Sequence, residues 1–254
     1  MMFEEILPYS KKTIAIRPLY FKDAMNLARF IHEENYRGLA RFIDDFFNIH
    51  DLHIVDKLFV CLIARKLFID EKIRLKGKSN VDIQVQVLIN RLSIEPTEQV
   101  FEQNGLRIVC DVPNKLHFTD VILDSIKSIT ALDTTIDFRN LDEDERDTIL
   151  SKLSPSAVRC VYDFIKDSKS DITILPARPS LELNEITINL LSQDPLMLVK
   201  LIFSDYTLNY FRELIVILGK SVGVSMLEYS TLADAVFYLE EMQRDSSGNI
   251  DIEL

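Results

Sequence analysis

The sequence is poor in glycine and proline and has no long hydrophobic run. Only 6 Gly and 8 Pro occur among 254 residues, which excludes collagen-like sequence and leaves little room for linkers. Crossing a bilayer takes roughly 20 consecutive apolar residues. The most apolar stretches, 58–64 and 214–218, are far shorter. We therefore expect long secondary-structure elements in a chain that does not span a membrane.

Cysteine is also scarce. Cys61, Cys110 and Cys160 are odd in number and widely spaced, and each lies among apolar residues. This pattern is typical of reduced core thiols in a cytosolic protein, since disulfide frameworks need paired cysteines. The opening residues, MMFEEILPYSKK, carry acids where a secretory signal has a basic start, and no suitable apolar stretch follows. These features predict a cytoplasmic location.

The sequence does contain ample apolar and acidic residues. Hydrophobic residues make up 47% of the chain and charged residues 27%, a composition typical of a folded globular protein. Asp and Glu number 40 against 29 Lys and Arg, giving a net charge of -11. Because such a charge repels phosphate backbones and anionic lipids, nucleic acid and membranes are not expected partners.

The N-terminal third predicts one strand and three helices. Residues 13–17 alternate branched and small side chains and end at a proline, which is typical of a short strand. Apolar residues then recur at helical spacing over 21–33, 36–47 and 53–68. Asp51 is the expected cap of the third helix.

The hydrophobic period then changes. Residues 72–76 and 106–112 have strand character, and 81–89 alternate apolar and polar side chains with period two. Residues 77–80 would form the turn between the first two strands. Together these segments predict a small antiparallel meander.

Helical signals return from Thr119. We expect a helix from 120 onward, a second over 143–153 that begins with a capping box, and a third from Pro155 to about 169. This completes an N-terminal α+β region, residues 1–170, with helices in 21–68, a sheet in 72–112 and helices in 119–169.

The prolines at 176 and 179 make residues 170–180 the best candidate boundary. Beyond it, 181–254 should form a C-terminal helical region, or continue the same domain. Three helices are expected in this region: one that begins at Asp194-Pro195, one over 206–221, and a last one that begins at Thr231. The tail after about residue 244 should be loose. The predicted fold class is α+β, mainly helical with a small antiparallel sheet.

Motifs for phosphate binding are incomplete. Two Gly-Lys-Ser triplets, at 77–79 and 219–221, match the last three residues of the P-loop motif. That motif also needs a glycine five positions earlier, and here those positions hold Lys72 and Leu214. The second triplet also falls near a helix end, where exposed carbonyls repel phosphate. We interpret the triplets as a strand turn and a helix end, and expect no nucleotide cofactor.

Other polar clusters favour structural roles. His50, His53 and Cys61 are spaced poorly for a zinc site, so capping and a core thiol explain them better. The acids at 142–145 lie at a predicted helix start, where they offset the helix dipole. A basic strand with Lys72, Arg74, Lys76 and Lys78 could contact RNA, but no aromatic residues alternate with its charges. We expect no metal and no catalytic residues.

Several stretches resemble a known family. Five stretches carry the resemblance: the strand closed by Arg17-Pro18 and followed by Tyr20-Phe21-Lys22-Asp23-Ala24, the run at 58–65, the segment 120–129, the stretch 141–155 with its Glu-Arg pair and Leu-Ser-Pro end, and the block 208–241. They are similar to the baseplate-hub assembly proteins of T-even-type contractile-tailed bacteriophages. The resemblance spans most of the chain. The resemblance consists of a shared hydrophobic pattern and a few short sequence motifs.

This resemblance implies a non-enzymatic protein that helps build the baseplate hub in the infected host's cytoplasm, as an assembly factor or as a minor hub subunit of the virion. Its partners would be other hub or tail proteins, and self-association stays open. Aromatic residues are common interface anchors, so the expected partner-binding residues are Tyr206, Tyr210, Phe211, Tyr229, Phe237 and Tyr238. A core role for most of them is the alternative.

Two other classes of function stay open at this point. One is a nucleotide-dependent enzyme that uses Lys78 or Lys220, and the other is an RNA-binding regulator that uses the strand from Lys72 to Lys78. Stabilisation by ATP or GTP would support the first class, because a bound ligand raises the melting temperature. Salt-dependent RNA affinity would support the second.

Overall fold

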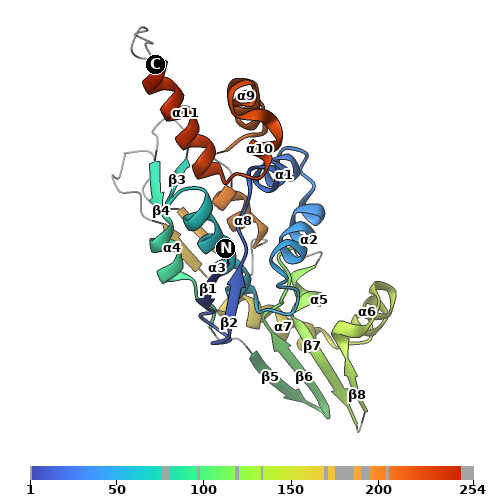
Figure 1. The fold of residues 1–254 in the computed structure, drawn as a ribbon. Helices are drawn as coiled ribbons and strands as arrows, with labels where there is room; N and C mark the ends of the chain where they lie inside the picture. The colour runs from blue at the N-terminus through green and yellow to red at the C-terminus, as the bar shows by residue number, and fades with distance from the viewer. Residues whose placement is uncertain are drawn as a thin grey trace.

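The computed structural model describes residues 2–75, 81–95, 98–117, 120–132, 134–168, 171–174, 186–189, 195–203 and 206–246. Over these residues the chain is mainly helical and has small antiparallel sheets, which confirms the predicted α+β fold class. Most helices gather at one end of the molecule, and a four-stranded sheet lies at the other (Figure 1). We call these ends the helical region and the sheet region.

The helical region begins with a hairpin and three helices. Strand β1 (Phe3–Ile6), which the sequence did not predict, pairs antiparallel with β2 (Thr13–Ile16). Helices α1 (Phe21–His32), α2 (Tyr36–Phe47) and α3 (Ile54–Phe68) follow where the apolar spacing predicted them.

The expected cap of α3 was wrong. Asp51 lies too far ahead of the first helical residue, and His53 caps the helix instead, its Nδ1 accepting a hydrogen bond from the amide of Val55 at 3.3 Å. Capping thus depends on the residue immediately before the helix, which the apolar pattern located only approximately.

The predicted strand over 81–89 is only half correct. Strand β4 (Val81–Gln84) pairs with β3 (Lys72–Leu75), and the chain then turns into α4 (Val85–Arg91). Val85 and Leu88 are three residues apart and both buried, so this segment fits a helix that packs on α3. The alternation of apolar residues alone did not distinguish the strand period over 81–84 from the helical period over 85–91.

The four-stranded sheet has the antiparallel order β5 (Glu98–Gln103), β6 (Leu106–Asp111), β7 (Ile126–Ala131) and β8 (Thr134–Asp137). The expected single meander is therefore wrong, because β6 pairs within this sheet and not with β3 or β4. The expected helix from 120 is short, α5 (Val121–Ser125), and runs directly into β7.

A bulge explains why β7 looked helical in sequence. Ile126 and Ile129 are three residues apart, a spacing that predicts one helix face. In the sheet the register between β6 and β7 shifts at Val109 and Cys110, which leaves one extra residue on β7. Ile126 and Ile129 are consequently both buried although they lie on a strand.

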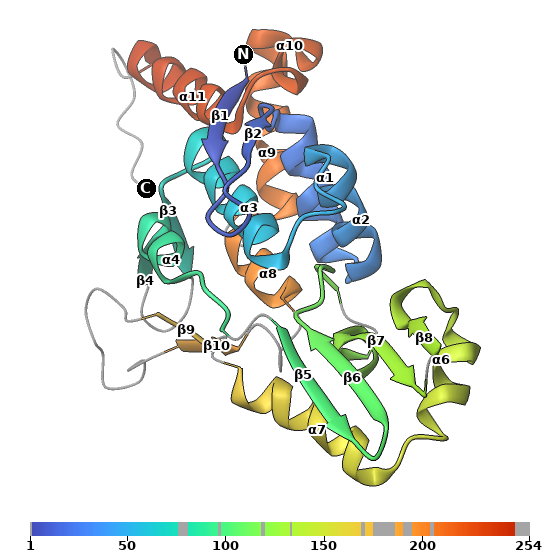
Figure 2. The ribbon, with the colours of Figure 1, turned by 90° about the horizontal axis from the view of Figure 1, so that it is seen from below.

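Two helices complete the sheet region. A short turn of 3-10 helix, η1 (Phe138–Asn140), leads into α6 (Glu143–Leu150), whose predicted capping box between Asp142 and Glu145 is present. Helix α7 (Pro155–Asp167) begins as predicted with Ser154 as its cap, and it packs against β5 and β6 (Figure 2).

The predicted boundary at 170–180 contains strand β9 (Asp171–Ile174), which pairs antiparallel with β10 (Ile186–Asn189). The rest of that stretch, including both prolines, lies outside the described residues. The tail from residue 247 also lies outside them.

Four helices follow in the described part of the chain after residue 195. They are α8 (Leu196–Phe203), α9 (Leu208–Leu218), α10 (Val224–Glu228) and α11 (Leu232–Ser246), with a π-helical turn, η2 (Gly219–Gly223), between α9 and α10. The predicted cap of the last helix is confirmed, since the Asp234 amide donates to Oγ1 of Thr231 at 3.1 Å. No helix in the described part of the chain is long and apolar enough to cross a membrane.

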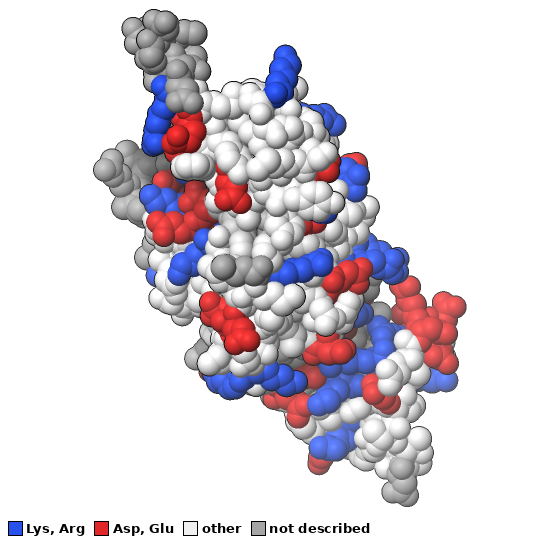
Figure 3. Space-filling view, viewed as in Figure 1, with Lys and Arg blue, Asp and Glu red and all other residues white. Residues whose placement is uncertain are grey.

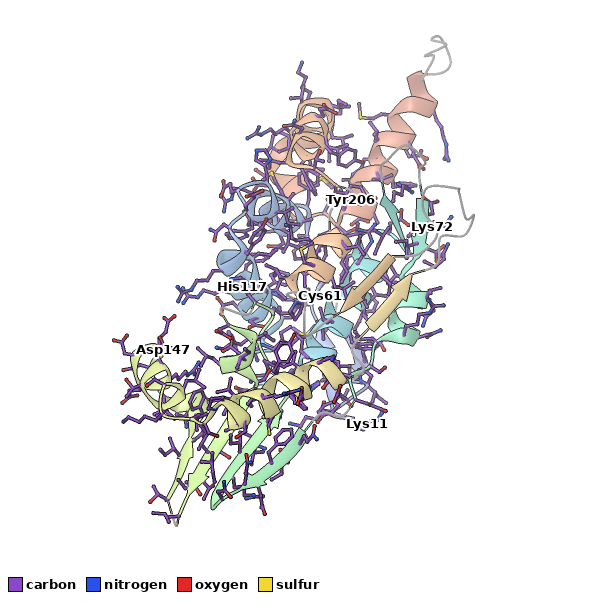
Figure 4. All side chains as sticks on the ribbon, turned by 180° about the vertical axis from the view of Figure 1, so that it is seen from behind. Lys11, Cys61, Lys72, His117, Asp147 and Tyr206 are labelled. Atoms are coloured by element: carbon purple, nitrogen blue, oxygen red, sulfur yellow. The ribbon has the colours of Figure 1, made fainter. Side chains whose placement is uncertain are left out.

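The N-terminal and C-terminal helices share one core. Helix α1 packs against α8, α9, α10 and α11, and α3 packs against α8. Cys61 lies in this interior (Figure 4), and burial raises the pKa of its thiol. Cys110 is buried in the sheet region, where burial raises its pKa to about 12, whereas Cys160 is half-buried. All three cysteines are free thiols, as the sequence predicted.

Candidate protein-docking surface

The expected partner-binding aromatics lie in three different environments. Phe211 is only 1% exposed and packs its ring 5.1 Å from that of Phe21, so its proposed surface role is wrong. Tyr238 is half-buried against the core. Tyr229 and Phe237 are 63% and 56% exposed. A docking role therefore stays a prediction for the residues other than Phe211.

Three of these aromatics line one groove. Tyr206, Tyr210 and Phe237 form part of a depression of about 420 Å³ between the start of α9 and the first turns of α11. Tyr206 lies beside α11 in the helical region (Figure 4). Its ring centroid is 5.3 Å from that of Tyr210. The aromatic walls of the groove therefore come from the segment before α9, from α9 and from α11.

Charged residues border this aromatic groove on the side of β3. Asp70 accepts from the amide of Lys72 at 3.0 Å, and its other oxygen pairs with Arg74 at 2.8 Å. Burial raises the pKa of the Tyr210 hydroxyl, so this group stays protonated and can donate a hydrogen bond at neutral pH. Glu240 adds a further carboxylate to the groove. An apolar segment with a few polar groups would fit this groove chemically.

A second exposed apolar area lies on α9 and α10, and the sequence analysis did not identify it. It consists of Val216 and Ile217 on α9, Val224 and Met226 on α10, and Tyr229 just after α10. We call these five residues the α9–α10 patch; Val216, Met226 and Tyr229 are 66%, 57% and 63% exposed. Few charged side chains cover α9 and α10 on this face of the molecule (Figure 3).

Local geometry brings the two helices of the patch together. The π-helical turn ends at Gly223, whose φ of +89° is accessible to glycine and strained for other residues. A Cβ on Gly219 would lie 3.0 Å from Cγ2 of Val224, so a larger residue there would require the Val224 side chain to shift by a few tenths of an ångström. The two glycines bound the turn that joins α9 to α10, and the two helices are in contact.

One sequence signal could have located this patch. Helix α9 buries Phe211, Leu214 and Leu218 along one face, yet Val216 and Ile217 are apolar as well. A surface helix normally has a single apolar stripe. The second apolar side of 208–218 therefore indicates either deeper burial or an exposed binding surface, and the structure shows exposure.

The residues considered for phosphate binding lie as follows. Gly219, Lys220 and Ser221 form the π-helical turn at the C-terminal end of α9, where the helix dipole disfavours anions. Residues 77–79, together with Lys76 of the basic strand, lie outside the described residues. On β3, Arg74 is paired with Asp70.

The residues considered for metal binding or acid chemistry have structural partners. His53 caps α3 and stacks on Tyr9 at 3.9 Å, whereas the imidazole of His50 lies 3.1 Å from Asp45. Asp142 and Glu145 form the capping box of α6. Across the residues that the structure describes, no three His, Cys, Asp or Glu side chains could jointly hold a metal ion.

The fold and surface define a mainly helical α+β protein with an aromatic groove and an exposed apolar patch on its C-terminal helices. Comparisons with protein-family models, with curated proteins and with solved structures find no match to this chain. Function is therefore inferred from this surface and from the resemblance in sequence.

Proposed function

We propose that the protein works by binding other proteins through the α9–α10 patch and the neighbouring aromatic groove. The observation that supports this proposal is the concentration of exposed apolar side chains on two packed helices. Large apolar side chains exposed together favour a protein interface, whereas single ones need no explanation. A net charge of -11 keeps such a protein soluble while the patch awaits a partner.

We propose further, on the resemblance in sequence, that the partners are hub or tail proteins of a contractile-tailed phage baseplate. In this function the chain is a non-enzymatic assembly factor in the cytoplasm of the infected host. A minor structural subunit of the finished hub is the alternative within the same class. Both functions require the same property, a surface that binds another subunit.

Co-expression with candidate hub and tail proteins tests this function. The chain is purified by a tag, and the partners that remain bound are identified and their dissociation constants measured. The double variant Ile217→Ser with Met226→Ser removes two exposed side chains of the patch. We expect it to bind its partner about tenfold more weakly or worse, since a few buried apolar anchors dominate interfaces.

A matched control is Val100→Ser on β5. Val100 is also exposed, at 42%, but it belongs to the sheet region, so binding should not change. If no hub or tail protein binds the wild-type chain, the proposed partners are wrong. If both variants bind as the wild type does, the α9–α10 patch is not the interface. Presence of the chain in purified particles would favour the structural subunit over the assembly factor.

A further inference from the structure

A second pocket adjoins the α9–α10 patch at Tyr229. Its volume is about 380 Å³, and it lies where β2 ends and α1 begins. Tyr20 contributes to its wall, and the ring of Tyr20 is 6.5 Å from that of Tyr229. The pocket thus lies next to the surface proposed for docking, but its chemistry differs from that of the patch.

Two cations line this pocket, and aromatic rings hold both of them. The guanidinium carbon of Arg17 lies 3.6 Å from the ring centroid of Phe46, and Nζ of Lys22 lies 4.1 Å from that of Tyr229. Neither side chain forms an ion pair with a carboxylate in the described part of the chain. Their positions are therefore fixed while their N–H groups stay available to a ligand.

The one carboxylate that lines the pocket has a partner already. Asp23 is 8% exposed and accepts a hydrogen bond from the amide of Tyr20 at 3.2 Å as part of the cap of α1. Burial raises the pKa of Asp23, although Lys22 and Arg17 oppose that shift. Two cations against one capping carboxylate leave the pocket positive, in a chain whose net charge is -11.

We propose that this pocket binds a carboxylate side chain within an acidic, partly apolar segment of a partner protein. A guanidinium stacked on a ring presents its edge to a carboxylate in the geometry of a bidentate pair. Pro18, Phe46 and Tyr20 give the pocket apolar walls that suit the neighbouring side chains of such a segment. The inference rests on the proposed function and specifies the chemistry of the partner.

The charge of the whole chain favours a protein segment over nucleic acid. A long polyanion would experience the net charge of -11 of the whole chain, which repels it, whereas a short acidic segment experiences mainly the local charges of Arg17 and Lys22. RNA is accordingly an outcome that the experiment must be able to reveal.

Fluorescence anisotropy on the full chain tests this proposal. The probe is a short fluorescein-labelled peptide in which glutamate alternates with leucine and serine. The control peptide has the same sequence with glutamine in place of each glutamate. We expect the glutamate peptide to bind about tenfold more tightly or better, as charge-assisted hydrogen bonds allow. The variants Arg17→Gln and Lys22→Gln should each weaken its binding about tenfold.

Lys152→Gln is the matched control, because it removes an exposed cation in the sheet region. It should change the affinity by no more than about twofold, since remote exposed charges are screened. Equal binding of the two peptides, or glutamate-peptide binding that neither pocket variant weakens, would overturn the proposal. So would tighter binding of a labelled RNA oligonucleotide that depends on Arg17 and Lys22.

The same variants separate this inference from the proposed function. If a hub or tail protein binds the wild type and both pocket variants equally well, the pocket proposal fails and the assembly function stands. If no such protein binds, but the glutamate peptide binds through Arg17 and Lys22, the proposed partners fail and the pocket proposal stands.

Discussion

The helical region and the sheet region are stabilised in different ways. In the helical region, α3 is buried on almost all sides, and even Lys57 and Arg65 are at most 1% exposed. In the sheet region, α6 buries no residue, and ion pairs tie the elements together. Asp124, for example, lies 2.6 Å from Lys115 and 3.6 Å from Arg146.

The two regions also differ in the apolar residues that they expose. In the sheet region, Val100, Leu132 and Tyr162 are exposed at separate places, on β5, between β7 and β8, and on α7, which is ordinary for a protein surface. In the helical region the exposed residues of the α9–α10 patch lie on packed helices. Because α9 and α10 pack on a well-buried core, binding is a better explanation for the α9–α10 patch than weak folding.

The largest expected effect comes from breaking the helical core. Phe21→Ala removes a ring that is fully buried and packs edge-on against Phe211. We expect a loss of about 3–5 kcal/mol in the free energy of unfolding, because a large cavity remains between α1 and α9. Urea denaturation measures it as a lower midpoint with an unchanged slope.

Phe237→Ala is the control for this comparison, because it deletes the same side chain at a site that is 56% exposed. We expect a change of at most about 0.5 kcal/mol there. Similar losses for the two variants would mean that Phe237 contributes to folding, which would weaken the assignment of the aromatic groove to binding.

An intermediate effect is expected from the ion pairs of the sheet region. Asp124→Asn preserves the shape of a nearly buried side chain but removes the charge that Lys115 and Arg146 face. Lys115 is half-exposed and can be hydrated, while Arg146 keeps its hydrogen bond to the carbonyl of Phe138 at 3.1 Å. We therefore expect a loss of about 2 kcal/mol, less than for a fully buried pair.

The matched control is Asp163→Asn on α7. Asp163 is half-exposed and lies 3.8 Å from Arg159, one helical turn away. Exposed pairs of this kind contribute at most about 0.5 kcal/mol. An equal effect of the two substitutions, measured by urea denaturation in the same buffer, would show that Asp124 does not hold the sheet region together.

The same difference between regions governed what the sequence could predict. The helices over 21–32, 36–47 and 54–68 were predicted almost to the residue, because each buries apolar residues at regular spacing. In the sheet region, the three-residue spacing of Ile126 and Ile129 predicted a helix, but a bulge lets both side chains face the core from a strand. Bulges depend on the partner strand, which a local pattern does not contain.

The docking surface was predictable in part. Aromatic content drew attention to 206–238, where Tyr229 and Phe237 are exposed, but it included Phe211, which is buried against Phe21 far away in sequence. Arg17 and Lys22 entered only through the family resemblance and were not identified as binding residues. Their association with Phe46 and Tyr229 joins three separate segments, 17–22, α2 and the end of α10, and only the folded chain brings those rings to the cations.

The smallest expected effect concerns the junction between the two regions. His53 lies at the start of α3, stacks on Tyr9, and interacts electrostatically with Asp56 and with Arg139 of the sheet region. Burial lowers its pKa from 6.5 to about 4. The unfolded chain therefore binds a proton between these pH values and the folded chain does not. Stability from this group is complete above about pH 6.5 and falls as the pH drops toward 4.

His53 is partly exposed, so solvent screening reduces the effect to about 1 kcal/mol. His53→Asn keeps a capping acceptor for α3 but cannot titrate. Urea denaturation of both proteins at several pH values between 7 and 4 isolates the contribution, because carboxylates titrate equally in both. The wild type should lose about 1 kcal/mol more than His53→Asn over this range. Parallel curves would mean that the junction admits a charged imidazole, and the two regions would then be less tightly packed at α3 than the burial of His53 indicates.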